Sequence, residues 1–141
     1  MNKEYEEKTM RHLNTFKIFA LVLLVAFLAA CRTAPIYNVD DAPVTTADNA
    51  QPTMKQIEQA IVQAGTGLGW RMEPQGPGHI VGTLYLRGNM AQVDINYDRK
   101  SYSIHYKDSK GLNYDGEKIH KNYNGWVQNL DNRIRSRLIS L

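Results

Sequence analysis

The 141-residue sequence contains a single cysteine, Cys31, and only four histidines. One cysteine forms no internal disulfide, and it excludes the zinc and iron–sulfur sites that need several cysteine ligands. The histidines show neither H-x-H nor H-E-x-x-H spacing and join no carboxylate cluster, so we expect no metal site and no cofactor. The formal net charge of +3 gives the chain no strong preference for polyanions, and we expect no nucleic-acid partner.

The sequence also lacks an apolar run long enough for a transmembrane helix. Residues 18–30 are all apolar (IFALVLLVAFLAA), but a bilayer-spanning helix needs roughly 20 such residues. The shorter run is typical of a signal peptide, and Arg11 and Lys17 supply the positive charge that precedes it. Residues 28–31 (LAAC) resemble the lipobox of bacterial lipoproteins, in which the cysteine is lipidated and becomes the first mature residue. We therefore expect a signal peptide over residues 1–30 and a lipid, such as palmitate, on Cys31.

The ends of this signal carry two further indications. Residues 1–9 contain three glutamates, which are unusual in a signal peptide, whereas a chain starting at Met10 would begin with a basic, acid-free region. We therefore expect the natural start at Met10, with residues 1–9 as an extension. Arg32 follows the cysteine where an aspartate would resemble an inner-membrane retention signal. We expect a lipid-anchored protein on the periplasmic face of the bacterial outer membrane.

The expected mature chain divides into a tether and one domain. Residues 31–52 are poor in large apolar side chains, contain Pro35, Pro43 and Pro52, and show no helical or strand period, which predicts a flexible tether. Residues 53–141 form the expected periplasmic domain. Thr53 and Gln56 have the spacing of a capping box, which predicts a helix beginning there.

A series of antiparallel strands should follow. Gly88-Asn89 is typical of a two-residue hairpin turn between residues 79–87 and 90–97, and a second turn is expected at residues 98–101. These turns predict the pairs Leu84/Val93, Ile95/Ile104 and Tyr97/Tyr102, all on one apolar face. The alternation predicts a sheet that is covered on one side only.

A C-terminal amphipathic helix should cover that side. Apolar residues recur every three or four positions from Ile119 to Leu138, and Asp115 is the expected N-cap. The predicted fold is therefore α+β, a two-layer sandwich of order α-β-β-β-β-α with both helices on one face of the sheet. Tyr123 and Trp126 should be largely buried, and Gly125 should allow close approach of the helix to the sheet.

The uncovered face of the sheet is the first candidate binding surface. Asp94 should lie opposite His105 as a cross-strand pair, with Gln92 opposite Lys107 and Asn96 opposite Ser103. Such a row also suggests a hydrolase-like enzyme centred on Asp94 and His105, but a flat face offers neither a cavity nor desolvation, so we expect no catalytic site. The expected contact residues on this face are Thr83, Tyr85, Gln92, Asp94, Asn96, Ser103, His105 and Lys107.

The junction between the last strand and the C-terminal helix is the second candidate. Asn124 and Gly125 have poor helix propensity, yet they lie inside the best amphipathic pattern of the chain. Such conflicts between local and global preference often mark functional or close-packing positions. Asn122 and Asn124 are expected to bond to loop backbone around residues 109–116. The candidate residues of this junction are Asn113, Tyr114, His120 and Asn124.

The region around the junction resembles a group of small proteobacterial lipoproteins. The shared pattern is I-H-x-x-Y-N-x-W-V-x-N-L, here residues 119–130, and the pieces at 69–70, 87–97 and 102–106 are similar to the same group. The resemblance implies a lipoprotein and assigns no catalytic or binding residue. We expect a non-enzymatic envelope accessory or binding module, whose partner is another envelope protein, peptidoglycan or lipopolysaccharide. The alternatives are the enzyme above and a structural or stress-response protein without a small ligand.

Overall fold

The computed structural model describes residues 2–30 and 32–141, and it describes side chains for residues 8–22 and 32–141. The chain forms two compact units, Met1–Thr33 and Ala34–Leu141. The first contains the helix α1 (Asn2–Ala30), and the predicted lipidation site Cys31 lies outside the described residues. Among the described residues, no helix combines the length and the apolar character that crossing a bilayer requires.

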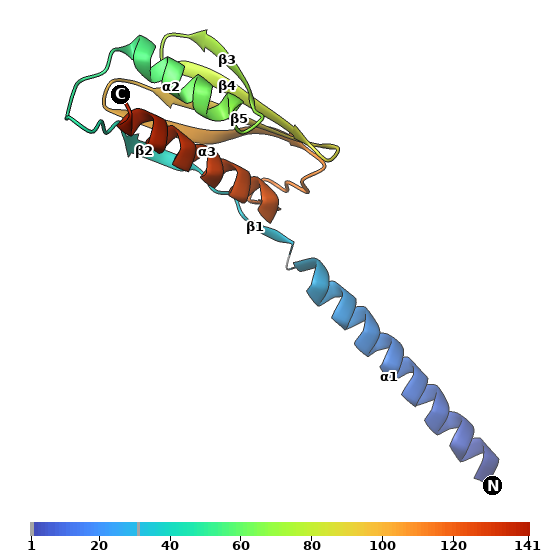
Figure 1. Ribbon diagram of the computed structural model, residues 1–141. Coiled ribbons are helices and arrows are strands. Elements are labelled where there is room, and N and C mark those ends of the chain that lie inside the picture. The colour runs from blue at the N-terminus through green and yellow to red at the C-terminus, as the bar shows by residue number, and fades with distance from the viewer. Residues whose placement is uncertain (1, 31) are drawn as a thin grey trace. The chain divides into compact units, whose positions relative to one another are not determined.

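The second unit is a two-layer α+β domain, as the sequence predicts (Figure 1). A five-stranded antiparallel sheet has the order β2-β6-β5-β4-β3, and a small second sheet pairs β1 with β7. Figure 1 shows α2 and α3 side by side on one side of the large sheet. The elements are β1 (Thr33–Pro35), β2 (Val39–Pro43), α2 (Met54–Thr66), β3 (Arg71–Gly76), β4 (His79–Leu86), β5 (Asn89–Tyr97), β6 (Ser101–Lys110), β7 (Lys118–His120) and α3 (Lys121–Ile139).

The hairpin between β4 and β5 turns one position earlier than predicted. Arg87 and Gly88 both have positive φ angles, 52° and 79°, which is the signature of a type I′ turn. The pairs are therefore Leu84 with Ala91 and Ile80 with Ile95, a shift of two residues from the prediction. Because side chains alternate with period two, a two-residue shift leaves every side chain on its expected face.

The hairpin between β5 and β6 has the predicted register. Tyr97 pairs with Tyr102 and Ile95 with Ile104. Asp98 Oδ1 accepts hydrogen bonds from the backbone N–H groups of Lys100 and Ser101, which fixes the turn. Further along, the register shifts between Gln92 and Val93, so Gln92 lies opposite Asp108 instead of the predicted Lys107. Lys107 is the extra residue of this β-bulge.

Both helices begin with a side-chain cap. Thr53 and Gln56 form the predicted capping box at the start of α2. The start of α3 differs from the prediction, because it begins at Lys121 with His120 as its N-cap. Asp115 instead accepts hydrogen bonds from the backbone N–H groups of Glu117 and of Lys118, the first residue of β7.

The core lies between the two helices and the covered face of the sheet. Both layers contribute side chains with no exposed surface, and these include Ile57, Ile61, Ile80, Val93, Ile95, Ile104, Tyr123, Val127, Leu130 and Ile134. Tyr123 is buried as predicted, whereas Trp126 is only partly buried. The prediction for Gly125 is wrong, because a Cβ at this position would meet no atom within 4 Å.

The predicted flexible tether is the largest difference between sequence expectation and structure. Residues 33–43 contribute β1 and β2, and β2 forms an edge of the large sheet beside β6. Val39 and Ala42 are 5% and 4% exposed, so this segment contributes side chains to the core. Pro43 lacks an N–H group, which an edge strand tolerates and a central strand does not. We refer to residues 33–43 as the arm.

Candidate functional site

The open sheet face is the side of the large sheet that α2 and α3 leave uncovered. Asp94 of β5 lies opposite His105 of β6, and Asn96 lies opposite Ser103, as predicted. The face is carried by a rigid antiparallel sheet, which positions side chains more accurately than a loop does. The polar side chains that β2, β4, β5 and β6 contribute to it include Asp40, His79, Thr83, Gln92, Asp94, Asn96, Ser103, His105 and Lys107.

One group of charged side chains forms around Asp94. His79 Nε2 lies 2.7 Å from Asp94 Oδ1, and Lys107 Nζ lies 3.0 Å from both carboxylate oxygens. Partial burial opposes ionisation of Asp94, but the hydrogen bonds from His79 and Lys107 outweigh it and lower the pKa of the carboxyl group. Asp94 is therefore a carboxylate held between two nitrogen donors.

A second group involves the arm. His105 Nε2 lies 2.7 Å from Asp40 Oδ1, and the backbone N–H of Asp41 donates to Ser103 Oγ at 3.0 Å. Asp41 has a φ angle of 46° in the irregular part of β2, which separates Asp40 from the regular ladder. The cross-strand neighbours Asp94 and His105 therefore bond to different partners. His79 and Asp40 were not predicted, although in the structure each contacts one member of the predicted pair.

The exposure of this face differs from residue to residue. Thr83 is only 5% exposed and accepts a hydrogen bond from Gln92 Nε2 at 3.1 Å. The prediction of Thr83 as a contact residue is wrong, because neighbouring side chains on a central strand cover it. Tyr85 lies near the end of the same strand and is 69% exposed, and Asn96 is also exposed. Tyr85 is thus the large aromatic side chain that this face presents to solvent.

The loop–helix junction forms a separate group. Tyr114 stacks on Tyr106 with ring centroids 4.2 Å apart, and Asn113 is an exposed loop residue with a φ angle of 51°. His120 caps α3 and Asn124 lies in its first turn. Asn124 contacts the arm and His120 contacts the backbone of α3, so the hydrogen bonds of this group lie apart from those of the open sheet face.

Asn124 has a specific structural role. Its Oδ1 accepts a hydrogen bond from the backbone N–H of Tyr37 at 3.0 Å, and its Nδ2 donates to the carbonyl of Pro35 at 2.9 Å. The amide thus pairs with the arm as a neighbouring strand would. The expectation that an asparagine here bonds to backbone is confirmed, but the backbone belongs to residues 35–37 and not to the loop at residues 109–116.

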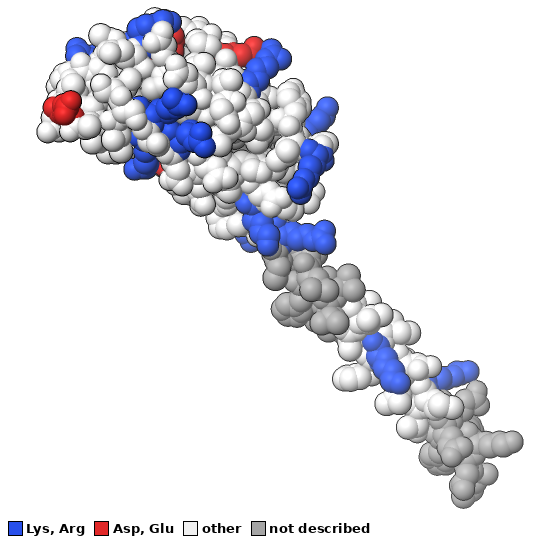
Figure 2. All heavy atoms as spheres, viewed as in Figure 1, with Lys and Arg blue, Asp and Glu red and all other residues white. Residues whose placement is uncertain are grey.

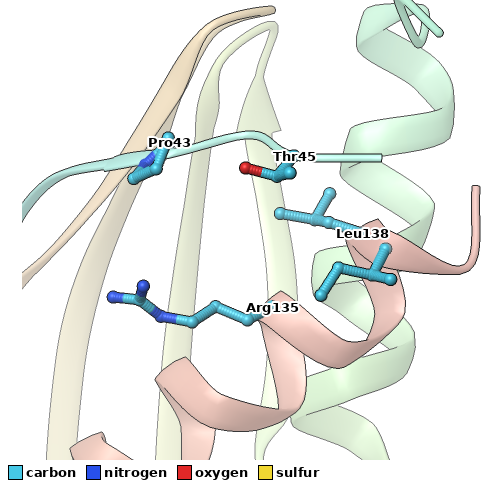
Figure 3. A pocket seen from close by; sticks show the side chains of 5 residues that line it. Pro43, Thr45, Arg135 and Leu138 are labelled. Atoms are coloured by element: carbon cyan, nitrogen blue, oxygen red, sulfur yellow. The ribbon is translucent and has the colours of Figure 1, made fainter. Parts of the chain in front are cut away.

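A pocket of about 180 Å³ lies between the end of the arm and the last turns of α3 (Figure 3). Its lining includes Pro43, Thr45, Arg135 and Leu138. Most small-molecule sites occupy roughly 300–1,000 Å³, so this pocket is small for one. Arg135 already bonds through Nε and Nη2 to the buried carboxylate of Asp131, so the guanidinium group is paired within the protein.

The hydroxyl and charged groups of the open sheet face are engaged with one another. Ser103 Oγ accepts a hydrogen bond from the backbone N–H of Asp41 and lies 3.5 Å from Asp41 Oδ1, whereas His105 is paired with Asp40. Within the part of the chain that the structure describes, no group of three or more His, Cys, Asp or Glu side chains is arranged for a metal ion. What remains is a flat surface of mutually paired charges with an exposed aromatic side chain beside it.

No family model matches the sequence, and neither a curated protein nor a solved structure shows significant similarity to the chain.

Proposed function

We propose that the protein is a lipoprotein of the bacterial outer membrane, anchored through Cys31, whose periplasmic domain is a non-enzymatic binding module. The signal-peptide pattern and the LAAC segment at residues 28–31 support the anchor. The observation that carries the binding role is the open sheet face, which holds paired charges at fixed positions. Two Asp–His pairs and Lys107 are fixed there by contacts of 2.7–3.0 Å.

The flat shape of the face favours a macromolecular partner over a small molecule. Charged groups held in position give specificity because a wrong partner would leave them unpaired. Tyr85, at 69% exposure, is a suitable anchor because aromatic side chains dominate the energy of many interfaces. Another envelope protein, peptidoglycan and lipopolysaccharide all have the size for such a surface.

The anchor is tested by metabolic labelling. We expect the wild-type protein to incorporate a palmitate analogue and to fractionate with the outer membrane, and Cys31→Ala to lose both properties. A label that persists in Cys31→Ala would contradict this site of lipidation. Unlabelled wild-type protein would contradict the lipoprotein assignment altogether.

The binding face is tested by photo-crosslinking in living cells. A photoreactive amino acid replaces Tyr85 in one variant and Asn132, an exposed residue of α3, in the matched control. We expect a discrete adduct from position 85 that weakens when Lys107→Ala is added, and no such adduct from position 132. Identical adducts from both positions, or none from position 85, would contradict a role for the open sheet face.

A further inference from the structure

The chain between the lipidation site and the folded domain is very short. Arg32 alone separates Cys31 from β1, which starts at Thr33. Two residues of extended chain span at most about 7 Å. The start of the arm adds no flexible length to this connection, because it is hydrogen-bonded to the domain. Asn124 bonds to Pro35 and Tyr37, and the backbone N–H of Ile36 donates to the carbonyl of Glu117.

This attachment determines which end of the domain lies near the anchor. β1 pairs with β7, which leads directly into the first turn of α3. The loop before β7 belongs to the same end, since the backbone N–H of His120 donates to the carbonyl of Leu112. Figure 1 shows β1 beside the start of α3. We call residues 110–121 together with β1 the proximal end.

The proximal end carries three exposed lysines and two acidic residues, an excess of one positive charge. Lys110, Lys118 and Lys121 are exposed, and none of them has an ion-pair partner among the residues that the structure describes. Two acidic residues lie among them, Asp115 and Glu117, and the Asp115 carboxylate is bonded to the backbone of its own turn. Figure 2 shows several Lys and Arg side chains exposed along the right-hand side of the domain in that view.

An aromatic side chain accompanies these lysines. Tyr114 is 39% exposed, with its ring stacked on Tyr106 and its hydroxyl donating to the carbonyl of Gly116 at 3.2 Å. Tyrosine is enriched at the membrane–water interface because its ring is apolar and its hydroxyl is polar. Lysines near an anionic bilayer surface each add attraction that salt weakens.

We infer that the proximal end docks on the anionic phospholipid surface that holds the acyl chains of Cys31. This inference rests on the proposed lipoprotein function. The anchor brings the proximal end to the headgroups, and Lys110, Lys118, Lys121 and Tyr114 contact them. α3 has 19 residues and is therefore about 28 Å long, so its two ends lie at clearly different positions in the domain. The domain thus stands on the membrane in one orientation instead of moving freely on a tether.

The test measures which end of the domain is near the lipid. Lipidated mature protein is purified from membranes and reconstituted in vesicles of phosphatidylcholine and phosphatidylglycerol that carry a quencher on some headgroups. Because the lipid occupies the native cysteine, one introduced cysteine accepts one dye. Asn122→Cys places the dye in the first turn of α3, and Asp48→Cys places it beside the other end, where Ala47 bonds to Ile139.

We expect headgroup quenching at position 122 to exceed that at position 48 several-fold. The difference should shrink with Lys118→Gln plus Lys121→Gln, with about a fivefold weaker docking equilibrium for each lysine removed. It should also shrink in vesicles of phosphatidylcholine alone, and with Asn124→Ala, which frees the arm and lengthens the tether.

Other outcomes would overturn the inference. Equal quenching at both positions would mean that the domain has no preferred orientation, and stronger quenching at position 48 would mean that another face docks. An orientation that is the same on neutral and anionic vesicles would exclude recognition of anionic lipid. The mass of the purified protein separates these results from failure of the anchor. Protein without acyl chains would overturn the lipoprotein proposal, whereas lipidated protein with equal quenching would overturn only the docking.

Discussion

Asn124→Ala tests how firmly the arm is attached to the domain. The substitution removes the two hydrogen bonds to Pro35 and Tyr37 and leaves the sheet and the core side of α3 unchanged. We expect a less stable domain in which the first residues of the arm open locally. Asn122→Ala is the matched control, because it lies two residues away and its exposed side chain makes no hydrogen bond with any described residue.

The structure gives the size of the effect. A typical hydrogen bond contributes a net ~1 kcal/mol to stability, so losing two lowers the free energy of unfolding by about 2 kcal/mol. Alanine is favoured over asparagine in a helix by roughly 0.5 kcal/mol, which offsets part of the loss at position 124. The control gains the same propensity without any loss. The two variants should therefore differ by about 2 kcal/mol.

Two measurements check this prediction. Urea unfolding should give the difference in the free energy of unfolding between the two variants. Hydrogen exchange should show faster exchange at Ile36 and Tyr37 in Asn124→Ala, with β4 and β5 unchanged. If residues 33–38 exchange at the same rate in both variants and their stabilities agree, the arm is not held by Asn124 and the reasoning fails.

Three further predictions follow from single contacts, and the last two use paired variants. The folded-state pKa of Asp94 lies below the ordinary 3.8, so the contribution of this carboxylate to the free energy of unfolding is complete above about pH 4 and is lost as the pH falls through the lower folded value. In urea titrations, Asp94→Asn should therefore flatten the loss of stability between pH 5 and pH 2. An unchanged pH profile would contradict this. Tyr102→Phe should lower the free energy of unfolding by about 1.5–3 kcal/mol because the tyrosine hydroxyl donates to the buried carboxylate of Asp131. Tyr123→Phe should leave it nearly unchanged because its buried hydroxyl has no partner among the described residues. Equal losses of stability on thermal unfolding would refute this difference. Gly125→Ala should stabilise α3 by up to about 1 kcal/mol because its methyl group would meet no other atom, whereas Gly65→Ala should give the less stable of the two variants because its methyl group would displace the side chain of Met72. The reverse order of melting temperatures would exclude this packing.

The fold class and one register were predictable because several local signals agreed. The β5–β6 pairing follows from a turn at residues 98–101 and from apolar residues such as Ile95 and Ile104 that fall on one face. The β4–β5 turn was misplaced by one position because Gly88-Asn89 is the better turn sequence, whereas Arg87 is an unusual residue at positive φ. The faces were nevertheless right, since the pleat preserves them under a shift of two residues.

The residues that lie on the open sheet face could be predicted better than the contacts between their side chains. The opposition of Asp94 and His105 follows from the register, and the structure confirms it. Which carboxylate each histidine contacts depends on side-chain reach across diagonal positions and on the edge strand beside β6. His79 contacts Asp94 from the neighbouring strand β4, and Asp40 contacts His105 from the arm. A prediction that omits the arm therefore has no partner for His105.

The arm was predicted as a tether because an edge strand and a flexible linker can have the same polar, proline-containing composition. Asp40, Asp41 and Pro43 are all disfavoured in a central strand, but they are compatible with an edge, where one side of the backbone needs no partner. The two apolar residues that reach the core, Val39 and Ala42, are separated by an irregularity in the ladder, so they do not alternate in the sequence. The true boundary of the folded unit thus lies at residues 33–34 and not at residue 53. A truncation that begins at residue 53 would expose one edge of β6 and remove the partners of His105 and Asn124, so the arm belongs to any fragment used to study binding.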